Sequence, residues 1–339
     1  MEVAIVILNW NGKKLLEQFL PSVVSFSNLK NVSIYVADNA STDVSINFVE
    51  QNYPTIKIIQ NKSNGGYAKG YNDALQHVKA DVYCLLNSDI EVTENWLHSI
   101  INTFKNQPNT AIIQPKIVDF KNKSYFEYAG AAGGFIDKFG YPFCRGRLFS
   151  TIEKDENQFN DEIEIFWASG ACFFIRAGVY HQLNGFDEDY FAHQEEIDVC
   201  WRAKNLGYAI KYVGTSKVYH VGGATLKEES PQKTYLNFRN SLFSLVKNLP
   251  KNALIPILFS RLVLDGIAAI KFLVELKFKH IFAILKAHVS FYKNLNKMLQ
   301  KRSKSTKMTN YYFTKSIVFD YYIKGKKTFD SLEKVKDLQ

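Results

Sequence analysis

Cysteine is scarce in this chain, and the few cysteines form no framework. Only four occur among 339 residues, and no two of them stand in a C-x-x-C pair. Three lie within apolar runs, which is typical of packed, reduced thiols. The sequence therefore disfavours a small fold stapled by disulfides, and its 46% hydrophobic composition predicts one or two domains with a large core.

Two glycine-rich phosphate motifs are also missing. The first apolar run, residues 3–8, leads into LNWNGKKL with a single glycine, whereas a dinucleotide-binding loop needs G-x-G-x-x-G. The G-x-x-x-x-G-K-[ST] loop of P-loop enzymes is absent as well. The N-terminus has no basic segment ahead of its apolar run, so we expect a first strand there, no signal peptide, and a cytoplasmic protein.

Acidic residues are few in the last third of the chain. Residues 235–339 carry 20 Lys and Arg against 6 Asp and Glu, whereas residues 1–234 carry 22 against 27. This imbalance predicts a negatively charged partner surface, such as a membrane or a nucleic acid. No zinc, RRM or KH motif accompanies the basic residues, so we expect no nucleic acid partner.

The sequence does contain a regular alternation of strand and helix patterns. Such alternation predicts an α/β fold with a mostly parallel central sheet and right-handed crossovers. Loops at the carboxyl ends of the strands form the ligand site in sheets of this kind. The expected strands span residues 3–8, 32–38, 56–60 and 81–87, and the expected helices lie near residues 13–26, 43–51 and 66–78.

The rest of the chain is less regular. Residues 119–165 are rich in glycine and aromatic residues and poorly periodic. We expect a first half-domain over residues 1–118, a second over 119–228, and a basic helical region over 229–339. We also expect a strand and turn at 166–178, a helix at 195–207 ended by Gly207, and a strand at 208–213.

Polar clusters follow the predicted strands. Asp38 ends the second strand, where its carboxylate can accept hydrogen bonds from a nucleotide base or a ribose, while Ser41 suits a helix cap. Gly65 and Gly66 suit either a tight turn or a close approach of the backbone to a diphosphate at a helix N-terminus.

LLNSDIEV, at the end of the fourth strand, offers Asn87 and Asp89. Both are turn formers, and both also carry oxygen ligands for a hard cation such as Mg²⁺ or Mn²⁺. His220 follows a later strand beside two glycines, where it is either structural or a further metal ligand.

Three acidic residues open the helix predicted in FAHQEEIDVCWR. They complement the helix dipole, and Asp198 also stands four residues before Arg202, a spacing typical of ion pairs. Glu195 and Glu196 remain without such a partner. A partly dehydrated glutamate at this place can serve as a general base.

Together these segments resemble the inverting GT-A glycosyltransferases of family 2, especially rhamnosyltransferase-like bacterial members. The resemblance covers about residues 3–225 and depends on the order and spacing of seven segments. They are VAIVILNWNG, VADNASTD, NGGYAKGYNDAL, LLNSDIEV, WASGACFFIR, NGFDEDYFAHQEEIDVCWR and VYHVGGAT. The resemblance implies a Rossmann-like GT-A fold and transfer of a sugar from a UDP- or dTDP-sugar to a glycan or lipid-linked glycan in cell-surface polysaccharide synthesis.

The resemblance also implies roles for single residues. The general base would be the second member of the pair Glu195 and Glu196, and a divalent cation, Mg²⁺ or Mn²⁺, would bind Asp89 with His220 able to join. On the acceptor side would lie Trp167, Ser169, Gly170 and Asp198. The donor would be held by Asn9, Trp10, Asp38, Asn64, Gly65, Gly66 and Asn87.

Two positions depart from the family pattern. The metal motif begins with Asn87 in place of aspartate, so Asp89 would neutralise most of the charge. The base position holds Glu196 in place of aspartate, so either the acceptor sits deeper or Glu195 is the base. A catalytically silent module that binds nucleotide sugar or glycan is the alternative to an enzyme.

A long apolar stretch at residues 252–278 resembles a membrane span in length. It contains Pro256 and is interrupted by Arg261, Asp265, Lys271 and Glu275, whereas a span needs about 20 apolar residues with few charges. We therefore expect helices that lie on an anionic membrane surface, at the inner face of the cytoplasmic membrane, or that pack on the catalytic domain. An ordinary helical bundle with a solvated basic face is the alternative.

Overall fold

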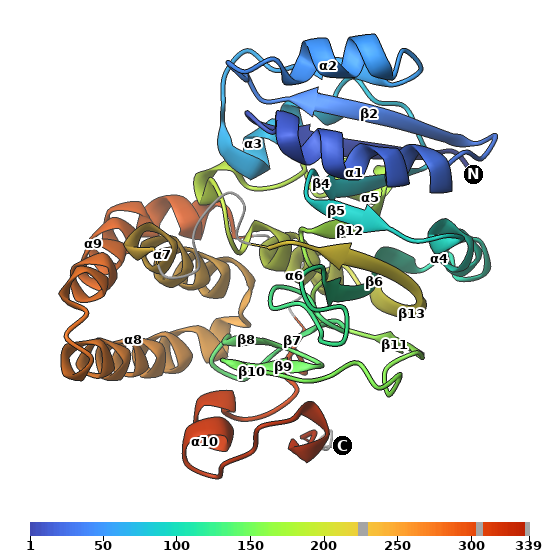
Figure 1. The fold of residues 1–339 in the computed structure, drawn as a ribbon. Helices are drawn as coiled ribbons and strands as arrows, with labels where there is room; N and C mark the ends of the chain where they lie inside the picture. Colours follow the sequence, from blue (N-terminus) through green and yellow to red (C-terminus); the bar gives the residue numbers. More distant parts are fainter. Residues whose placement is uncertain (223–229, 303–307, 336–339) are drawn as a thin grey trace.

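The four expected strands are present and form one half of a large sheet. β1 (Val3–Asn9) pairs in parallel with β2 (Val32–Asp38) and β4 (Val82–Asn87), and β3 (Lys57–Gln60) pairs in parallel with β2. The computed structural model, drawn in Figure 1, describes residues 1–222, 230–302 and 308–335.

Later segments complete this central sheet, in the order β11-β13-β6-β12-β4-β1-β2-β3. The β12 strand is antiparallel to both of its neighbours, whereas β13 is parallel to β6, so the sheet is mixed but mostly parallel, as expected. The short β5 pairs with the far end of β13. The bounds are β5 (Ile90–Val92), β6 (Thr110–Asp119), β11 (Glu162–Glu164), β12 (Cys172–Arg176) and β13 (Ala209–His220).

Alternation along the strands assigns helices to the two faces of the sheet. Val3 and Ile5 point into one core cluster with side chains of α1, α2 and α4, whereas Ala4 and Val6 point into another with α3, α5 and α6. The result is the three-layer arrangement of an α/β fold. The bounds are α1 (Lys13–Phe26), α2 (Ser45–Asn52), α3 (Gly66–Leu75), α4 (Trp96–Asn106), α5 (Ala177–Gln182) and α6 (Glu195–Asn205).

The segment 119–165, poorly periodic in sequence, contains a second sheet of four very short strands. Its members are too short to show a period of two, and glycines with positive φ at Gly140 and Gly146 turn the chain between them. α4 and β6 were not predicted either, and α5 forms where a turn was expected. The four strands are β7 (Gly134–Ile136), β8 (Pro142–Cys144), β9 (Arg147–Leu148) and β10 (Thr151–Ile152).

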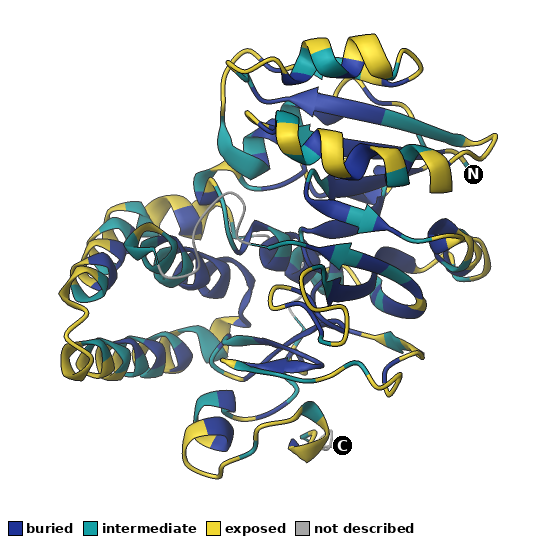
Figure 2. Cartoon of the chain, in the orientation of Figure 1, coloured by how far each residue is buried: buried dark blue, intermediate teal, exposed yellow. Residues whose placement is uncertain are grey.

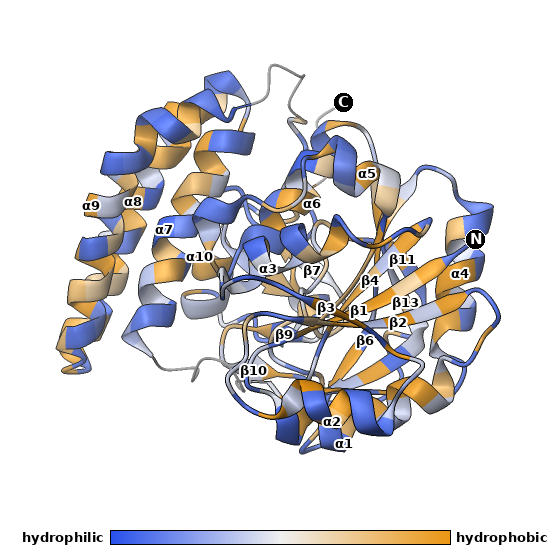
Figure 3. Cartoon of the chain, turned by 90° about the horizontal axis from the view of Figure 1, so that it is seen from above, coloured by the Kyte–Doolittle hydropathy of each residue, from blue (hydrophilic) through white to orange (hydrophobic). Residues whose placement is uncertain are grey.

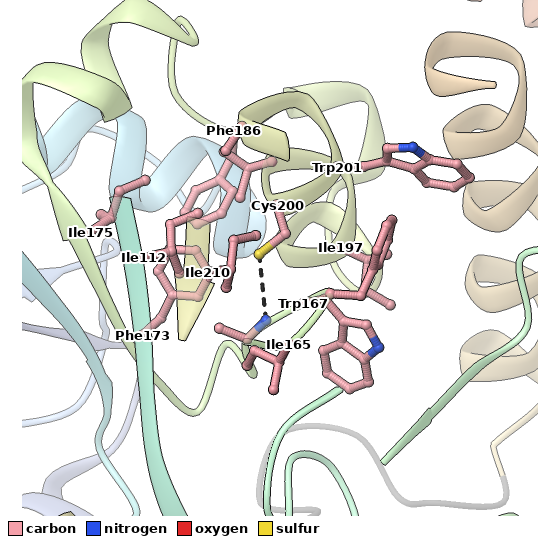
Figure 4. Close-up of a cluster of buried hydrophobic side chains, with 14 of the residues drawn as sticks. Ile112, Ile165, Trp167, Phe173, Ile175, Phe186, Ile197, Cys200, Trp201 and Ile210 are labelled. Carbon is pink, nitrogen blue, oxygen red and sulfur yellow. Dashed lines mark hydrogen bonds between the residues drawn. The ribbon is translucent and has the colours of Figure 1, made fainter. Parts of the chain in front are cut away.

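A dense apolar cluster fills the space under α6 (Figure 4). The side chains of Trp167, Cys200 and Trp201 lie in it, and the Ala168 N–H donates to Cys200 Sγ at 3.4 Å. All four cysteines belong to described parts of the chain and are free, buried thiols, which confirms the expectation from the sequence.

The C-terminal third is helical, as predicted. α7 packs against α6 and α9, and α8 and α9 form a hairpin beside the sheet (Figure 1). α8 continues through Pro256, which lies inside the helix. The expected boundary between residues 228 and 229 lies outside the described residues. The remaining elements are η1 (Glu188–Tyr190), α7 (Pro231–Asn248), α8 (Lys251–Val274), α9 (Phe278–Gln300), α10 (Ile317–Tyr322) and η2 (Phe329–Ser331).

Candidate active site

Hydrogen bonds join the loops that follow β1 and β2. The buried Asn9 donates through Nδ2 to Asp38 Oδ1 at 3.1 Å, to Ser41 Oγ at 3.2 Å and to Ser45 Oγ at 2.9 Å. Asp38 also accepts from the Ser41 N–H at 3.0 Å. Trp10, by contrast, is 51% exposed. Asn9 and Asp38 thus shape this edge of the sheet, while the Trp10 indole is open to a ligand.

The loop between β3 and α3 contacts a distant loop of the chain. Asn64 Oδ1 accepts from the Gly66 N–H at 2.9 Å, and Gly65 precedes the first turn of α3. Gly66 has φ +79°, and a Cβ there would lie 2.5 Å from the carbonyl oxygen of Phe191. The Tyr67 N–H donates to that same oxygen at 3.0 Å. The close approach that requires Gly66 is therefore to the loop before α6.

The ends of β4 and β13 bring Asp89 and His220 together. His220 Nε2 lies 3.2 Å from Asp89 Oδ1 and 3.5 Å from Asn87 Nδ2, and its Nδ1 lies 3.2 Å from Glu127 Oε1. Burial by itself lowers the pKa of His220, but the two carboxylates outweigh it and raise the pKa to about 10. The imidazolium thus stands between two buried carboxylates.

The chemistry of these side chains suits a hard divalent cation. Asp89 offers carboxylate oxygens, Asn87 an amide oxygen and His220 a ring nitrogen. Within the described ranges, however, no three His, Cys, Asp or Glu side chains are arranged to hold an ion as they stand. The residues fit a cation if His220 exchanges its carboxylate partners for it.

The chain enters α6 through a strained turn. Phe191, His193 and Gln194 have φ of 64°, 68° and 73°, which non-glycine residues rarely adopt. Each such residue costs on the order of 1–3 kcal/mol, and such strain is concentrated at functional sites. Glu195 and Glu196 follow directly in the first turn of α6.

Both of these carboxyl groups are poorly hydrated. Glu195 is 4% exposed, Glu196 is partly exposed, and Oε2 of each is buried with no hydrogen bond partner in the described structure. Burial, with the charge of Glu196, raises the pKa of Glu195 well above its usual value, and burial raises the pKa of Glu196 to about 7. Glu195 therefore favours its protonated form more than an ordinary glutamate does, while Glu196, with a pKa of about 7, can exchange a proton at neutral pH.

Tyr67 links this pair to the loop before β12. Its hydroxyl donates to the Gly170 carbonyl at 2.8 Å. Burial raises the pKa of Tyr67 well above its usual value, and Tyr71, Glu195 and Glu196 raise it further. Tyr67 therefore lies close to both carboxylates and stays protonated.

Helix α7 holds the loop that carries the strained residues. Asn240, which is fully buried, donates to the carbonyls of Tyr190 at 3.0 Å, Ala192 at 3.0 Å and His193 at 2.7 Å. Arg239 Nη2 donates to the Tyr190 carbonyl at 3.1 Å. The basic C-terminal region is thus part of the framework around Glu195 and Glu196.

Four residues were expected on the acceptor side, and two of them line the loop before β12. Ser169 is buried, its N–H donates to Gln114 Oε1 at 2.7 Å, and its Oγ accepts from the Ala171 N–H at 3.2 Å. Gly170 carries the carbonyl that Tyr67 binds. Both hold the loop in place beside Tyr67.

Trp167 and Asp198, by contrast, lie in the interior. The indole of Trp167 is 3% exposed and donates to the Phe135 carbonyl at 2.9 Å. The Asp198 carboxylate accepts from Arg202, Lys247 and Asn248, and Lys247 and Arg202 hold its pKa well below the usual range against the effect of burial. All of their polar atoms are thereby occupied, so we leave both residues out of the proposed site.

Sequence patterns missed several residues at this site. Glu127 lies in the irregular segment, where no motif marked it. Tyr67 and His193 stand inside quoted motifs but were not singled out, and Asn240 lies in the C-terminal region. Burial, with Lys233, lowers the pKa of His193 to about 4, and its Nε2 is buried without a partner among the described residues. A neutral imidazole therefore stands two residues before Glu195.

The chain is similar in sequence to proteins that transfer rhamnose. The chain is 26% identical over 231 residues to N-acetylglucosaminyl-diphospho-decaprenol L-rhamnosyltransferase of Mycobacterium tuberculosis (strain CDC 1551 / Oshkosh). The aligned region covers 64% of this chain and 75% of that protein. It is 26% identical over 200 residues to rhamnosyltransferase WbbL of Escherichia coli (strain K12), covering 56% and 73%.

Solved structures share the fold at low sequence identity. GalNAc-T7 with UDP, GalNAc and Mn²⁺ matches with a TM-score of 0.58 at 16% identity, over 74% of this chain and 48% of that chain. S. aureus TarS 1-349 with UDP-GlcNAc matches with a TM-score of 0.55 at 15% identity, over 88% and 91%. Residues 4–183, more than half of the chain, match the family model described as "Glycosyl transferase family 2". The chain therefore belongs to glycosyl transferase family 2, with a GT-A fold and rhamnosyltransferase relatives.

Proposed function

We propose that the chain is a metal-dependent, inverting glycosyltransferase. It would move a sugar from a UDP- or dTDP-sugar to a hydroxyl of a glycan or lipid-linked glycan in cell-surface polysaccharide synthesis. Membership of family 2 carries the glycosyl transfer from a nucleotide sugar. One observation supports a general base and so the inverting mechanism. Glu196, with a pKa raised to about 7, lies in the first turn after a strained loop at the carboxyl edge of the sheet.

Glu196 is the general base in this proposal. Glu196 is the less buried residue of the pair, whereas Glu195 is buried and its pKa is raised well above the usual value. A base with a pKa near the working pH is both ionised and basic enough to take a proton. These surroundings favour Glu196 over Glu195.

The donor would be held at the edge formed by the loops after β1, β2, β3 and β4. Trp10 would cover the base, Asp38 would accept from the base or the ribose, and Asp89 with Asn87 and His220 would hold Mg²⁺ or Mn²⁺. When bound, the cation neutralises charge on the diphosphate. The solved structures of GalNAc-T7 with UDP and Mn²⁺ and of a mannosyltransferase with GDP-Man and Mn²⁺ support a divalent metal.

The chemistry is a single displacement at the anomeric carbon. Glu196 takes the proton of the acceptor hydroxyl as its oxygen bonds to that carbon, while the bond from that carbon to the diphosphate oxygen breaks. The nucleoside diphosphate leaves with the electron pair, and the anomeric configuration inverts because the base and the leaving group lie on opposite faces.

The relatives support the acceptor and the place of reaction. The Mycobacterium tuberculosis relative is named for transfer of L-rhamnose to N-acetylglucosaminyl-diphospho-decaprenol, which is a lipid-linked glycan. We therefore place the reaction in the cytoplasm, at the inner face of the cytoplasmic membrane.

The test is a donor screen followed by product analysis. UDP- and dTDP-sugars should raise the melting temperature only with Mn²⁺ or Mg²⁺, because a ligand that binds only the native state stabilises it. NMR of the product from the best donor should show inversion at the anomeric carbon. Retention of configuration, or donor binding without turnover on any glycan or lipid-linked glycan acceptor, would contradict the proposal.

A further inference from the structure

Helix α8 presents its apolar residues to solvent. They recur every three or four residues and thus share one side of the helix, with exposed fractions of 50–79%. They include Ile255, Phe259, Val263, Ile267, Ile270 and Val274. A contiguous apolar surface of this length is typical of an interaction site, because single exposed apolar residues are normally scattered.

Two charged residues in the middle of α8 are turned inward, whereas Lys251 and Lys271 nearer its ends are exposed. Arg261 is 3% exposed and Asp265 is fully buried, and they pair at 3.0 Å. Arg261 donates to Ser241 Oγ at 2.8 Å and to the Phe139 carbonyl at 3.1 Å, and the Tyr141 hydroxyl donates to Asp265 at 3.2 Å. The helix is therefore docked through its polar side, the reverse of a helix on a water-soluble protein.

Helix α9 extends the apolar surface and adds positive charge. Phe278, Phe282, Leu285, Val289 and Tyr292 are 51–70% exposed along one side of the helix. The exposed residues Lys279, Lys286 and Lys293 are each seven apart, so they form a row directly beside that side. We call the exposed apolar residues of α8 and α9 together the apolar face; Figure 3 shows the two helices at one end of the molecule.

We propose that the apolar face lies on a bilayer that contains anionic phospholipid, with α8 and α9 along its surface. The apolar side chains would enter the acyl boundary while the lysine row meets the lipid phosphates, as in interfacial helices. Among the described helices, α8 alone is long and apolar enough to cross a membrane by length and composition. Its Arg261 and Asp265 contacts hold it flat against the protein.

The lysine row also argues for lipid over a second copy of the chain. Two such faces packed on each other would bring like charges together, which costs free energy. Anionic headgroups instead complement the row. The inference rests on the proposed function only for the acceptor, because a surface-bound enzyme can reach a lipid-linked glycan without extracting it from the bilayer.

Binding to extruded vesicles tests the inference without donor or acceptor. The full chain should sediment with vesicles of phosphatidylglycerol and phosphatidylcholine, and far less with phosphatidylcholine vesicles. The double variant Phe259→Ser/Phe282→Ser should lose about tenfold or more in partition, because two apolar anchors become polar. The triple variant Lys279→Glu/Lys286→Glu/Lys293→Glu should lose the preference for anionic vesicles.

The double variant Phe26→Ser/Leu29→Ser is the control. It also replaces two exposed apolar residues, 41% and 49% exposed, but at the end of α1, outside the apolar face. It should bind vesicles like the wild type, and all variants should keep a wild-type melting temperature. Equal vesicle binding by the wild type and the Phe259→Ser/Phe282→Ser variant would overturn the inference. The inference would also be overturned if the wild type were a dimer, the Phe259→Ser/Phe282→Ser variant were a monomer, and neither protein bound vesicles.

Failure here leaves the proposed function standing, because vesicle binding involves no sugar transfer. If the wild-type protein binds anionic vesicles but transfers no sugar, the proposed function alone is contradicted. The two ideas are thus tested by separate measurements on the same protein.

Discussion

At the scale of single residues, Glu195 and Glu196 are neighbours with different surroundings. Glu195 is buried, which with the charge of Glu196 raises its pKa well above the usual value, while Glu196 is partly exposed with a pKa raised to about 7. This difference assigns them different chemistry although both open the same helix. It also separates the expected effects of replacing each one.

Glu196→Gln should lower kcat about a thousandfold, because general-base catalysis contributes roughly 10²- to 10⁴-fold. The donor Kd should stay near wild type, since Gln has the same shape. Glu195→Gln should keep most activity, because Glu195 is the more deeply buried of the two and Gln preserves its shape. Single-turnover kinetics and donor titration check both variants, with the exposed Glu94→Gln as control. A loss confined to Glu195→Gln would reverse the assignment.

The same carboxylate predicts the pH dependence. The base acts when ionised, so kcat/KM should rise with pH and reach half its maximum near pH 7. The raised pKa also favours folding at low pH: this contribution is full below the ordinary value of 4.5 and is lost as pH rises through about 7. Urea unfolding of wild type and Glu196→Gln across this range should show the variant lacking that slope. A wild-type kcat/KM independent of pH from 5 to 8 would count against Glu196.

Asp89→Asn should weaken metal-dependent donor binding. The substitution removes a negative charge from the proposed cation site, so the Mn²⁺ concentration for half-maximal activity should rise about tenfold or more. Exposed Asp330→Asn is the matched control. The measurement is a Mn²⁺ titration of turnover at saturating donor. An unchanged titration would place the cation elsewhere.

Sequence patterns identify some of these residues and miss others for a physical reason. Asp89 comes just after a strand and Glu196 lies in the first turn of a helix, so the positions of both could be predicted from the sequence pattern. Glu127 reaches His220 from a segment of very short strands, and no period marks it. Trp167 and Asp198 have residue types suited to binding, but their burial and partners depend on tertiary packing.

At the scale of elements, α7 and the loop before α6 act together. Asn240→Ala removes three hydrogen bonds from carbonyls of that loop, so the loop should relax its positive-φ residues. We expect kcat to fall about tenfold and the unfolding free energy to fall by roughly 2–3 kcal/mol.

The pH profile distinguishes positioning from mere stability. If the loop opens to water, the apparent pKa of the rate should move from about 7 toward its ordinary value, because dehydration raised it. Asn252→Ala, at an exposed position of α8, should leave both the rate and the profile unchanged. A variant with lower stability but a wild-type profile would show that Asn240 does not position the base.

The elements themselves were predicted unevenly. β1, β2, β3 and β4 have continuous apolar runs, so their bounds agree with the expected ones within about two residues. α8 was expected only as part of a helical region without bounds of its own, and it contains Pro256. The charged residues of this stretch argue against a membrane span. Arg261 and Asp265, however, form an ion pair inside the protein, and sequence spacing alone does not reveal their burial.

At the scale of the whole molecule, the C-terminal helices and the sheet share one core. The cluster that contains Ala4 and Val6 of β1 also contains Leu242 of α7, Phe291 of α9 and Ile317 of α10. Figure 2 shows buried residues continuing from the sheet into α7. The central α/β body and the helical region are therefore joined by packing as well as by the chain.

This shared core predicts one cooperative unfolding transition. Urea denaturation followed by far-UV circular dichroism and by tryptophan fluorescence should give coincident curves, because the four tryptophans lie in residues 1–234 and the long helices after them. Lys247→Met, which removes a buried partner of Asp187 and Asp198, should shift both curves equally. Two separated transitions would show that the helical region folds on its own.

The inward-turned pair of Arg261 and Asp265 also bears on how the protein is made. During synthesis the sheet and α7 leave the ribosome before α8 does. The carbonyl of Phe139 and the hydroxyls of Tyr141 and Ser241 then stand ready for the polar side of α8. When the polar side of α8 packs on these groups, its apolar side is left facing the solvent. The contacts of Arg261 and Asp265 therefore set the orientation of the α8–α9 hairpin before the protein reaches a membrane.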